Sequence, residues 1–368
     1  MSKATWQGSL RSAAGAGGFQ KERVGVTTRS GKGGVPRSAL GDISNRSNGN
    51  NGGFGGAGKK GAMKPFSIAS QFTVQQQQEE KKRNNNRNVD IPNLHHTEPP
   101  AIDRSDVGDL RNPKYCAEYV NQIYDHFKEI EGDCSVFPNY MDKQDDINEK
   151  MRALLIDWLI QVHIKFELLP QTLYLTVNLL DRFLSIKVVP RRKLQLVGCT
   201  AMLLASKYEE IYAPEMNDFV SMSDKAFSIE ELLKMEGVLL NVLDFRLTAP
   251  SPYTFLRRYM KVACSSAKTQ HFATFLIERS LQEYSMLQYK PSMIAAAALY
   301  IAQDKTGEDG VPWTSTLVRH SGYTEDDITD LVETMVNLYS TNQKNYLQAV
   351  QKKYASSKYM YVSMINLM

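Results

Sequence analysis

The chain has 368 residues, a length that suits two medium-sized domains or one large domain together with a tail. Its hydrophobic fraction of 42% is ample for a core, and the lack of an apolar run of about eighteen residues and of a signal-peptide core argues against membrane insertion and secretion. The net charge of +4 conceals two segments: residues 1–105 carry 16 Lys and Arg against 7 Asp and Glu, or +9, and the rest carries 28 against 33, or −5.

Residues 1–110 are predicted to form a disordered basic tail. The first 105 residues hold 16 of the 23 glycines and few apolar clusters, so they cannot bury enough surface to offset the entropy of ordering. Basic residues of the tail are not interleaved with aromatic ones, which argues against nucleic-acid binding. The basic cluster at 81–87 fits either a nuclear import signal or a solvated run of charge.

One short motif in the tail, at 37–45, combines Arg37, Leu40, Ile43 and Asn45 in the order Arg-x-x-Leu-x-x-Ile-x-Asn. An extended peptide of this form can place its arginine on an acidic surface and its leucine in an apolar pocket of a receptor, which suits a segment that becomes ordered on binding. The motif resembles a mitotic destruction box, and that resemblance implies recognition by the anaphase-promoting ubiquitin ligase.

The folded part is predicted to begin near Asn112, with an N-terminal helical segment at 111–139. Tyr115, Tyr119 and Ile123 share one stripe of a helix expected over 113–131. Aromatic residues at this spacing either pack a core or contact a partner, and the pattern leaves both interpretations open.

A first helical domain is predicted at 140–248. The run 151–163 is apolar nearly all round, as in a helix inside a domain. Arg152 and Asp157 lie within it, and since an unpaired buried charge costs several kcal/mol, each is expected to have a partner. Prolines and a capping box punctuate five expected helices, at 147–168, 171–184, 191–208, 215–222 and 228–243.

The same pattern recurs at 249–352, and a C-terminal tail follows at 353–368. Pro214 and the capping box at 228–231 are echoed by Pro312 and 324–327, at an offset of about 97 residues that suits two tandem domains rather than a solenoid. The predicted fold class is therefore all-α, with two tandem five-helix domains after an N-terminal helix and a disordered tail.

Five blocks in order and spacing resemble a cyclin box: 151–163, 180–185, 194–198, 205–210 and 235–236. The resemblance covers about residues 113 to 350, and the run 255–258 together with Gln161 favours mitotic cyclins of the B type. It implies a regulatory subunit that binds and allosterically activates a cyclin-dependent serine/threonine kinase at the entry to mitosis, with no cofactor of its own. Nuclear and cytoplasmic localisation is the corresponding expectation.

The resemblance also implies roles for particular residues. The expected kinase contacts are Lys207, Glu236, Phe166, Tyr208 and Tyr119. A docking patch for substrates that carry an Arg-x-Leu motif is expected at Met151, Leu155, Trp158 and Gln195, although the helical spacing alone favours a core position for the first three. Arg152 and Asp181 are expected to form a structural ion pair.

Two other interpretations remain. The isolated histidines and the neighbouring carboxylates form no catalytic arrangement, and four scattered cysteines without ligand-spaced histidines indicate no metal site, so an enzyme is not expected. Tandem boxes also occur in transcription factors and pocket-type scaffold proteins, which bind DNA or peptides without a kinase. The −5 charge of residues 106–368 and the motif at 37–45 argue against that class.

Overall fold

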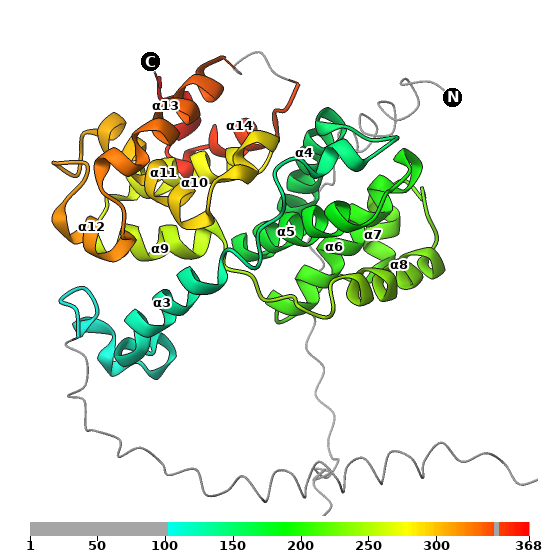
Figure 1. Cartoon of the computed structure of the whole chain (residues 1–368), viewed down its shortest axis with the longest axis horizontal. Helices are drawn as coiled ribbons and strands as arrows, with labels where there is room; N and C mark the ends of the chain where they lie inside the picture. Colours follow the sequence, from blue (N-terminus) through cyan, green and yellow to red (C-terminus); the bar gives the residue numbers. More distant parts are fainter. Residues whose placement is uncertain (1–101, 342–345, 368) are drawn as a thin grey trace, which may run out of the picture. The chain divides into compact units, whose positions relative to one another are not determined.

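The computed structural model describes residues 102–341 and 346–367, which belong to one compact unit. Helices make up all the regular structure in this part of the chain, and no strand occurs there, which confirms the all-α prediction (Figure 1). None of the helices in the described ranges is long and apolar enough to cross a membrane.

The first domain contains five helices, each within three residues of its predicted bounds: α4 (Glu149–Lys165), α5 (Pro170–Ile186), α6 (Leu194–Glu209), α7 (Met216–Met222) and α8 (Ile229–Val242). Local signals set their starts. The Asn148 side chain accepts a hydrogen bond from the Met151 amide at the start of α4, and Ser228 and Glu231 form a reciprocal capping box at the start of α8.

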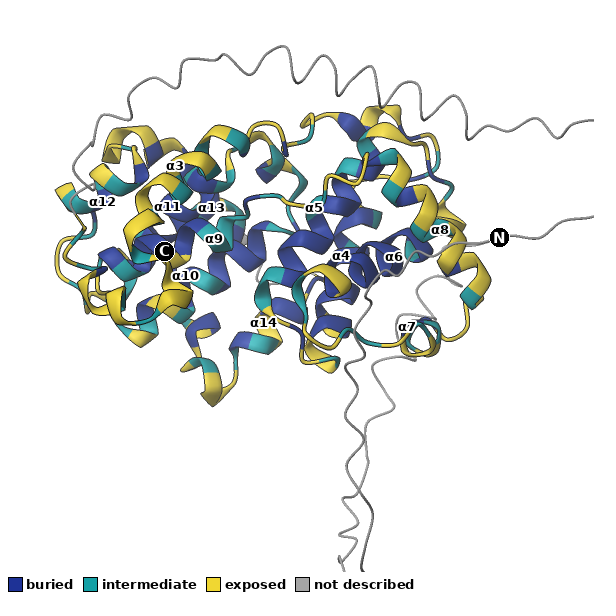
Figure 2. Cartoon of the chain, turned by 90° about the horizontal axis from the view of Figure 1, so that it is seen from below, coloured by how far each residue is buried: buried dark blue, intermediate teal, exposed yellow. Residues whose placement is uncertain are grey.

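Helix α6 is the centre of this domain and packs against α4, α5, α7 and α8. Twelve of its sixteen residues are buried, and α4, α5 and α6 are mostly dark blue in Figure 2. Gly198 allows the close approach, since a Cβ there would lie 3.0 Å from both Cδ atoms of Leu155 on α4.

The second domain repeats this arrangement with α9 (Pro252–Val262), α10 (Ala267–Ser280), α11 (Pro291–Thr306), α12 (Ser315–Ser321) and α13 (Glu325–Thr341). Its central helix is α11, which packs against α9, α10, α12 and α13. Four consecutive fully buried alanines, 295–298, let those neighbours approach closely. The two tandem five-helix domains are thus present as predicted.

The segment before the first domain differs from the expected continuous helix. The chain forms three 3-10 turns, Val107–Arg111, Pro113–Tyr115 and Ala117–Tyr119, and the α-helix, α3 (Val120–Ile130), begins seven residues later than predicted. Cys116 adopts a left-handed conformation, with φ of 48°, and this interrupts the helical path between the second and third turns. Residues 102–110, predicted to be part of the disordered tail, are ordered.

Asp157, the buried acid of α4, joins the first domain to the second. Its Oδ1 accepts hydrogen bonds from the Gln282 amide group and from the Ala349 backbone N–H, each at 2.8 Å. Burial raises the pKa of Asp157, and these donors partly oppose that shift. Ala349 opens α14 (Ala349–Tyr354), which packs on α4 and α10. Gln161 of α4 also donates to Oδ2 at 3.3 Å, so the partners of Asp157 come from its own helix and from the second domain.

Candidate protein-interaction site

Lys207 and Glu236 lie on two packed helices and form an ion pair. Lys207 is in the last turn of α6 and Glu236 is in the middle of α8, and Nζ of the lysine lies 2.6 Å from Oε1 of the glutamate. The lysine is exposed, while the side chain of the glutamate is mostly covered. The pair therefore presents a charged group on a surface that α6 and α8 share.

Helix α8 has more apolar side chains than the core of the free chain buries. Eight of its fourteen residues are Ile, Leu, Met or Val, but only Leu232 and Leu239 are buried. Exposed yellow covers much of this helix in Figure 2. Leu233, which is half-exposed, lies three residues before Glu236 and so on the same side of the helix. An apolar surface beside an ordered ion pair is typical of a site for another protein.

Tyr208 and Phe166, two other expected contacts on the first domain, lie in different surroundings. Tyr208 follows Lys207, is half-exposed, and its hydroxyl lies 2.5 Å from Oγ1 of Thr248. Phe166 caps the end of α4 and packs edge-on against Phe219, with ring centroids 5.2 Å apart, so it contributes to the core as well. Tyr119 belongs to a separate segment, the turn before α3, where it is exposed.

Two exposed side chains near this surface carry no signal that the sequence predictions used. Ile211 and Tyr212, directly after α6, are 90% and 91% exposed. The loop is anchored on α5, because Oε1 of Glu210 accepts from the Leu169 amide at 2.7 Å and from the Thr172 hydroxyl at 2.5 Å. In the sequence, these are two bulky apolar residues shortly before Pro214, outside any predicted helix. That position could have indicated exposed apolar side chains.

Arg152 and Asp181 meet in the interior. Nε of the arginine lies 2.7 Å from Oδ1 of Asp181, Nη2 lies 2.7 Å from Oδ2, and both side chains are almost fully buried. Burial lowers the pKa of Arg152, but the carboxylate outweighs it and raises the pKa overall. Tyr140 donates to the same Oδ1 at 2.8 Å, and Nη1 of Arg152 donates to the Leu281 carbonyl at 3.1 Å. The pair thus ties α4 and α5 to each other and to the second domain.

The expected docking patch is largely core in this chain. Leu155 and Trp158 are only 1% and 2% exposed, whereas Met151 and Gln195 are partly exposed. Close packing of α6 at Gly198 covers Leu155, which explains its burial. The expectation of an exposed stripe therefore needs correction for Leu155 and Trp158, and a surface at this place consists of Met151 and Gln195. The motif at Arg37, Leu40, Ile43 and Asn45 lies outside the described residues.

Comparison with known proteins identifies the family. Residues 122–248 match the model of the cyclin N-terminal domain, and residues 250–367 match the model of the cyclin C-terminal domain. The chain belongs to the cyclin family.

Similar relatives bear the names of B-type cyclins. The chain is 47% identical over 258 residues to Cyclin-B2-1 of Oryza sativa subsp. japonica, covering 70% of this chain and 60% of that protein. It is 48% identical over 263 residues to Cyclin-B2-4 of Arabidopsis thaliana, covering 71% and 60%. The aligned part thus spans about 60% of the length of these relatives.

A solved structure shares the fold. It is a viral cyclin from herpesvirus saimiri, with a TM-score of 0.53 and 22% sequence identity, covering 58% of this chain and 94% of that chain.

Proposed function

We propose that this cyclin is a regulatory subunit that binds and activates a cyclin-dependent serine/threonine kinase at the transition from G2 to mitosis. The observation that carries the proposal is the surface of α6 and α8, where the Lys207–Glu236 pair lies beside apolar side chains that the free chain leaves uncovered. Burial of such apolar surface favours association, and a fixed charge pair selects the partner.

A regulatory subunit of this kind acts by changing the conformation of the kinase. The uncovered apolar surface would pack on the mobile helix of the kinase, which places the glutamate of that helix against the ATP-binding lysine and reorders the activation loop. All groups for phosphoryl transfer belong to the kinase in this mechanism. The chain would bind the active conformation of the kinase more tightly than the inactive one, and this difference in affinity is what allosteric activation requires.

Co-purification tests this proposal directly. The full chain should purify with one stoichiometric protein kinase, and the complex should phosphorylate histone while neither partner does so alone. A transcription or pocket-type scaffold protein would instead purify with promoter-bound factors or peptides. Recovery of such a complex without kinase activity would exclude the proposed function.

Substrate recruitment is proposed for the partly exposed Met151 and Gln195. Met151→Ala with Gln195→Ala should weaken binding of an Arg-x-Leu peptide several-fold and leave the melting temperature nearly unchanged, because neither side chain is fully buried. Peptide titration followed by fluorescence anisotropy measures this effect. Trp158→Ala is the contrasting variant, and it should cost about 3 to 5 kcal/mol of stability because it opens a cavity. Unchanged peptide affinity in the double variant would remove the patch from the proposal.

Timed destruction is proposed to depend on Arg37 and Leu40. A receptor on the anaphase-promoting ubiquitin ligase would bind this pair, and Arg37→Ala with Leu40→Ala should prolong the half-life in mitotic-exit extract by about tenfold, as expected for loss of roughly 1.4 kcal/mol or more of binding. Lys59→Arg is the control and should be destroyed normally, since Lys60 and Lys64 are alternative acceptors in the same glycine-rich sequence. Rapid loss of the Arg37/Leu40 variant would make the motif accidental.

Nuclear and cytoplasmic localisation completes the proposal. It is supported by the basic cluster at 81–87, which fits a nuclear import signal. Imaging of a fluorescent fusion with Lys81, Lys82 and Arg83 changed to alanine tests it, and nuclear entry at the normal rate would assign import to another segment.

A further inference from the structure

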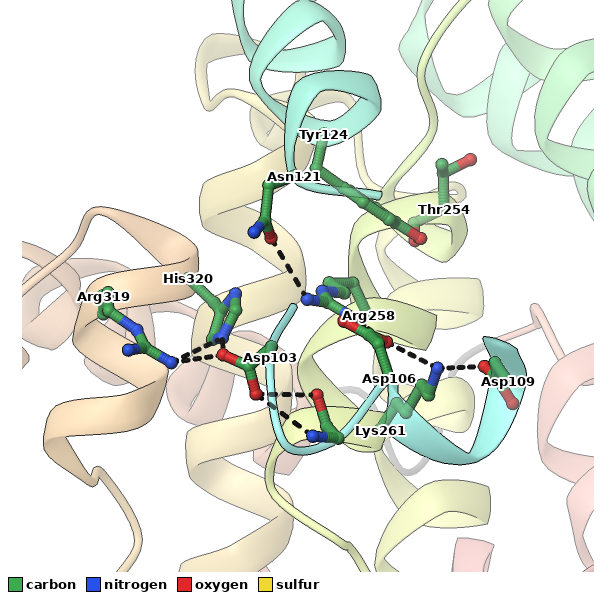
Figure 3. A network of polar contacts seen from close by, with 11 residues as sticks. Asp103, Asp106, Asp109, Asn121, Tyr124, Thr254, Arg258, Lys261, Arg319 and His320 are labelled. Atoms are coloured by element: carbon green, nitrogen blue, oxygen red, sulfur yellow. Dashed lines mark hydrogen bonds and ion pairs between the residues drawn. The ribbon is translucent and has the colours of Figure 1, made fainter. Parts of the chain in front are cut away.

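An acidic segment at 103–109, here called the acidic strap, is held on the second domain by three aspartates. Asp103 pairs with Arg319 and lies 3.0 Å from Nε2 of His320, both at the end of α12, and Asp109 pairs with Lys261 on α9. Figure 3 shows these side chains converging from the strap, α9 and α12. The strap is thus joined to residues that lie 152 to 217 positions later in the sequence.

Asp106 is the centre of this contact. Its side chain is 2% exposed, and Oδ1 accepts from Nη1 of Arg258 and from Nζ of Lys261, each at 2.7 Å. Burial raises the pKa of Asp106, but the hydrogen bonds from Arg258 and Lys261 outweigh it, so the pKa is lowered and the group is charged at neutral pH. A buried, doubly paired carboxylate fixes the strap in one position.

The strap runs into the first of the three 3-10 turns and supports the other two. Its backbone forms successive 3-10 hydrogen bonds, from Asp106 N to Asp103 O and from Asp109 N to Asp106 O, each 2.9 Å long. The turn Val107–Arg111 packs against the next two turns, which end at Tyr119. Arg258 also reaches Oδ1 of Asn121 at 3.4 Å, so one guanidinium holds both the strap and the first turn of α3.

These supported turns present two aromatic side chains to solvent. Tyr115 is 54% exposed and Tyr119 is 60% exposed, although each belongs to an ordered turn. Large aromatic residues on rigid backbone are the usual anchors of protein interfaces, because little entropy is lost when they bind. Their position relative to the surface of α6 and α8 depends on the turns, and the turns depend on the strap.

We infer that Asp103 and Asp106 are positioning residues for kinase binding. They hold the strap on α9 and α12 and thereby fix Tyr115 and Tyr119 in the orientation that the kinase contacts. This inference rests on the proposed function. Without the two carboxylates the turns sample several orientations, and the apparent affinity falls by the fraction of molecules in the competent one.

A double-mutant cycle on the full chain tests this coupling. Asp103→Asn with Asp106→Asn should raise the Kd for the purified kinase roughly tenfold, if about a tenth of the molecules keep the competent orientation. Tyr119→Ala should raise the Kd several-fold in the wild-type chain and far less in the strap variant, since the tyrosine is no longer positioned there. Hydrogen exchange of residues 113–121 should accelerate in the strap variant before any kinase is added.

Asp133→Asn with Asp142→Asn is the matched control, because it removes two exposed carboxylates and makes the same change in net charge. All titrations are run well below the melting temperature of each variant. An unchanged Kd in the strap variant, or full additivity with Tyr119→Ala, would overturn the inference while leaving the proposed function intact. Absence of kinase binding by the wild-type chain would instead overturn the proposed function, and this inference with it.

Discussion

Replacing Arg152 by alanine should lower the free energy of unfolding by about 3 to 5 kcal/mol, because it leaves a buried carboxylate without its cation. Asp181 would keep only the Tyr140 hydroxyl as a donor among the side chains that now bind it, and the Leu281 carbonyl would lose the guanidinium. For a folded region of this size, such a loss should lower the melting temperature by roughly 10 °C. Thermal unfolding followed by circular dichroism measures the shift.

Arg191→Ala provides the matched control within the same domain. Arg191 also pairs with an aspartate, Asp146, at 2.6 Å, but both side chains are exposed. An exposed pair contributes about 0 to 1 kcal/mol, so this variant should melt close to the wild type. Equal melting of the two variants would show that burial adds nothing to the Arg152–Asp181 pair and would contradict its structural role.

The helices of the first domain were predictable because their signals are local, and the second domain was predictable as a recurrence of the same pattern. Asn148 caps α4, Pro170 opens α5, and the Ser228–Glu231 capping box starts α8, each within a few residues of the chain position that it marks. The N-terminal segment lacks such a local signal. Tyr115, Tyr119 and Ile123 have helical spacing, but the left-handed conformation at Cys116 interrupts the helix, and cysteine carries no sequence signal for that conformation.

Long-range contacts explain what the sequence could not predict. The acidic strap has no periodicity of its own and is ordered by cations more than 150 residues away, so no local signal marks it as part of the fold. Helical spacing alone favoured a core position for Leu155 and Trp158, whereas the family resemblance favoured an exposed one, and the close approach of α6 at Gly198 covers Leu155.

Some residues of the candidate site were named from the sequence, but their exposure depends on how the helices pack. The family resemblance identified Lys207 and Glu236, and the structure adds that the two pair with each other across α6 and α8 in the free chain. The capping box predicted a helix at 228–243, but the exposure of its apolar side chains follows from how the five helices share one core. Ile211 and Tyr212 lie in a loop, where neither periodicity nor the matched blocks assign a role.

Replacing Lys207 and Glu236 together by alanine should abolish activation of the kinase while the fold is retained. Truncating charges that become desolvated in an interface costs about 2 to 5 kcal/mol, which corresponds to a loss of affinity of about thirtyfold or more. The stability of the free chain should change little, because an ion pair with an exposed lysine contributes less than about 1 kcal/mol. Histone phosphorylation by the reconstituted complex and the Kd for the kinase are the two measurements.

Lys268→Ala with Glu308→Ala is the control for this variant. That pair is partly exposed and joined at 3.1 Å, and it lies on the second domain, between α10 and the loop after α11. Its removal changes the same charges and should leave activation and affinity unaltered. Lys207 and Glu236 pair on the surface of the free chain and contribute little to its stability. A loss of kinase binding on their removal therefore reports on the surface of α6 and α8 and not on folding. Full histone-kinase activity in the Lys207/Glu236 variant would show that the kinase binds elsewhere on the chain.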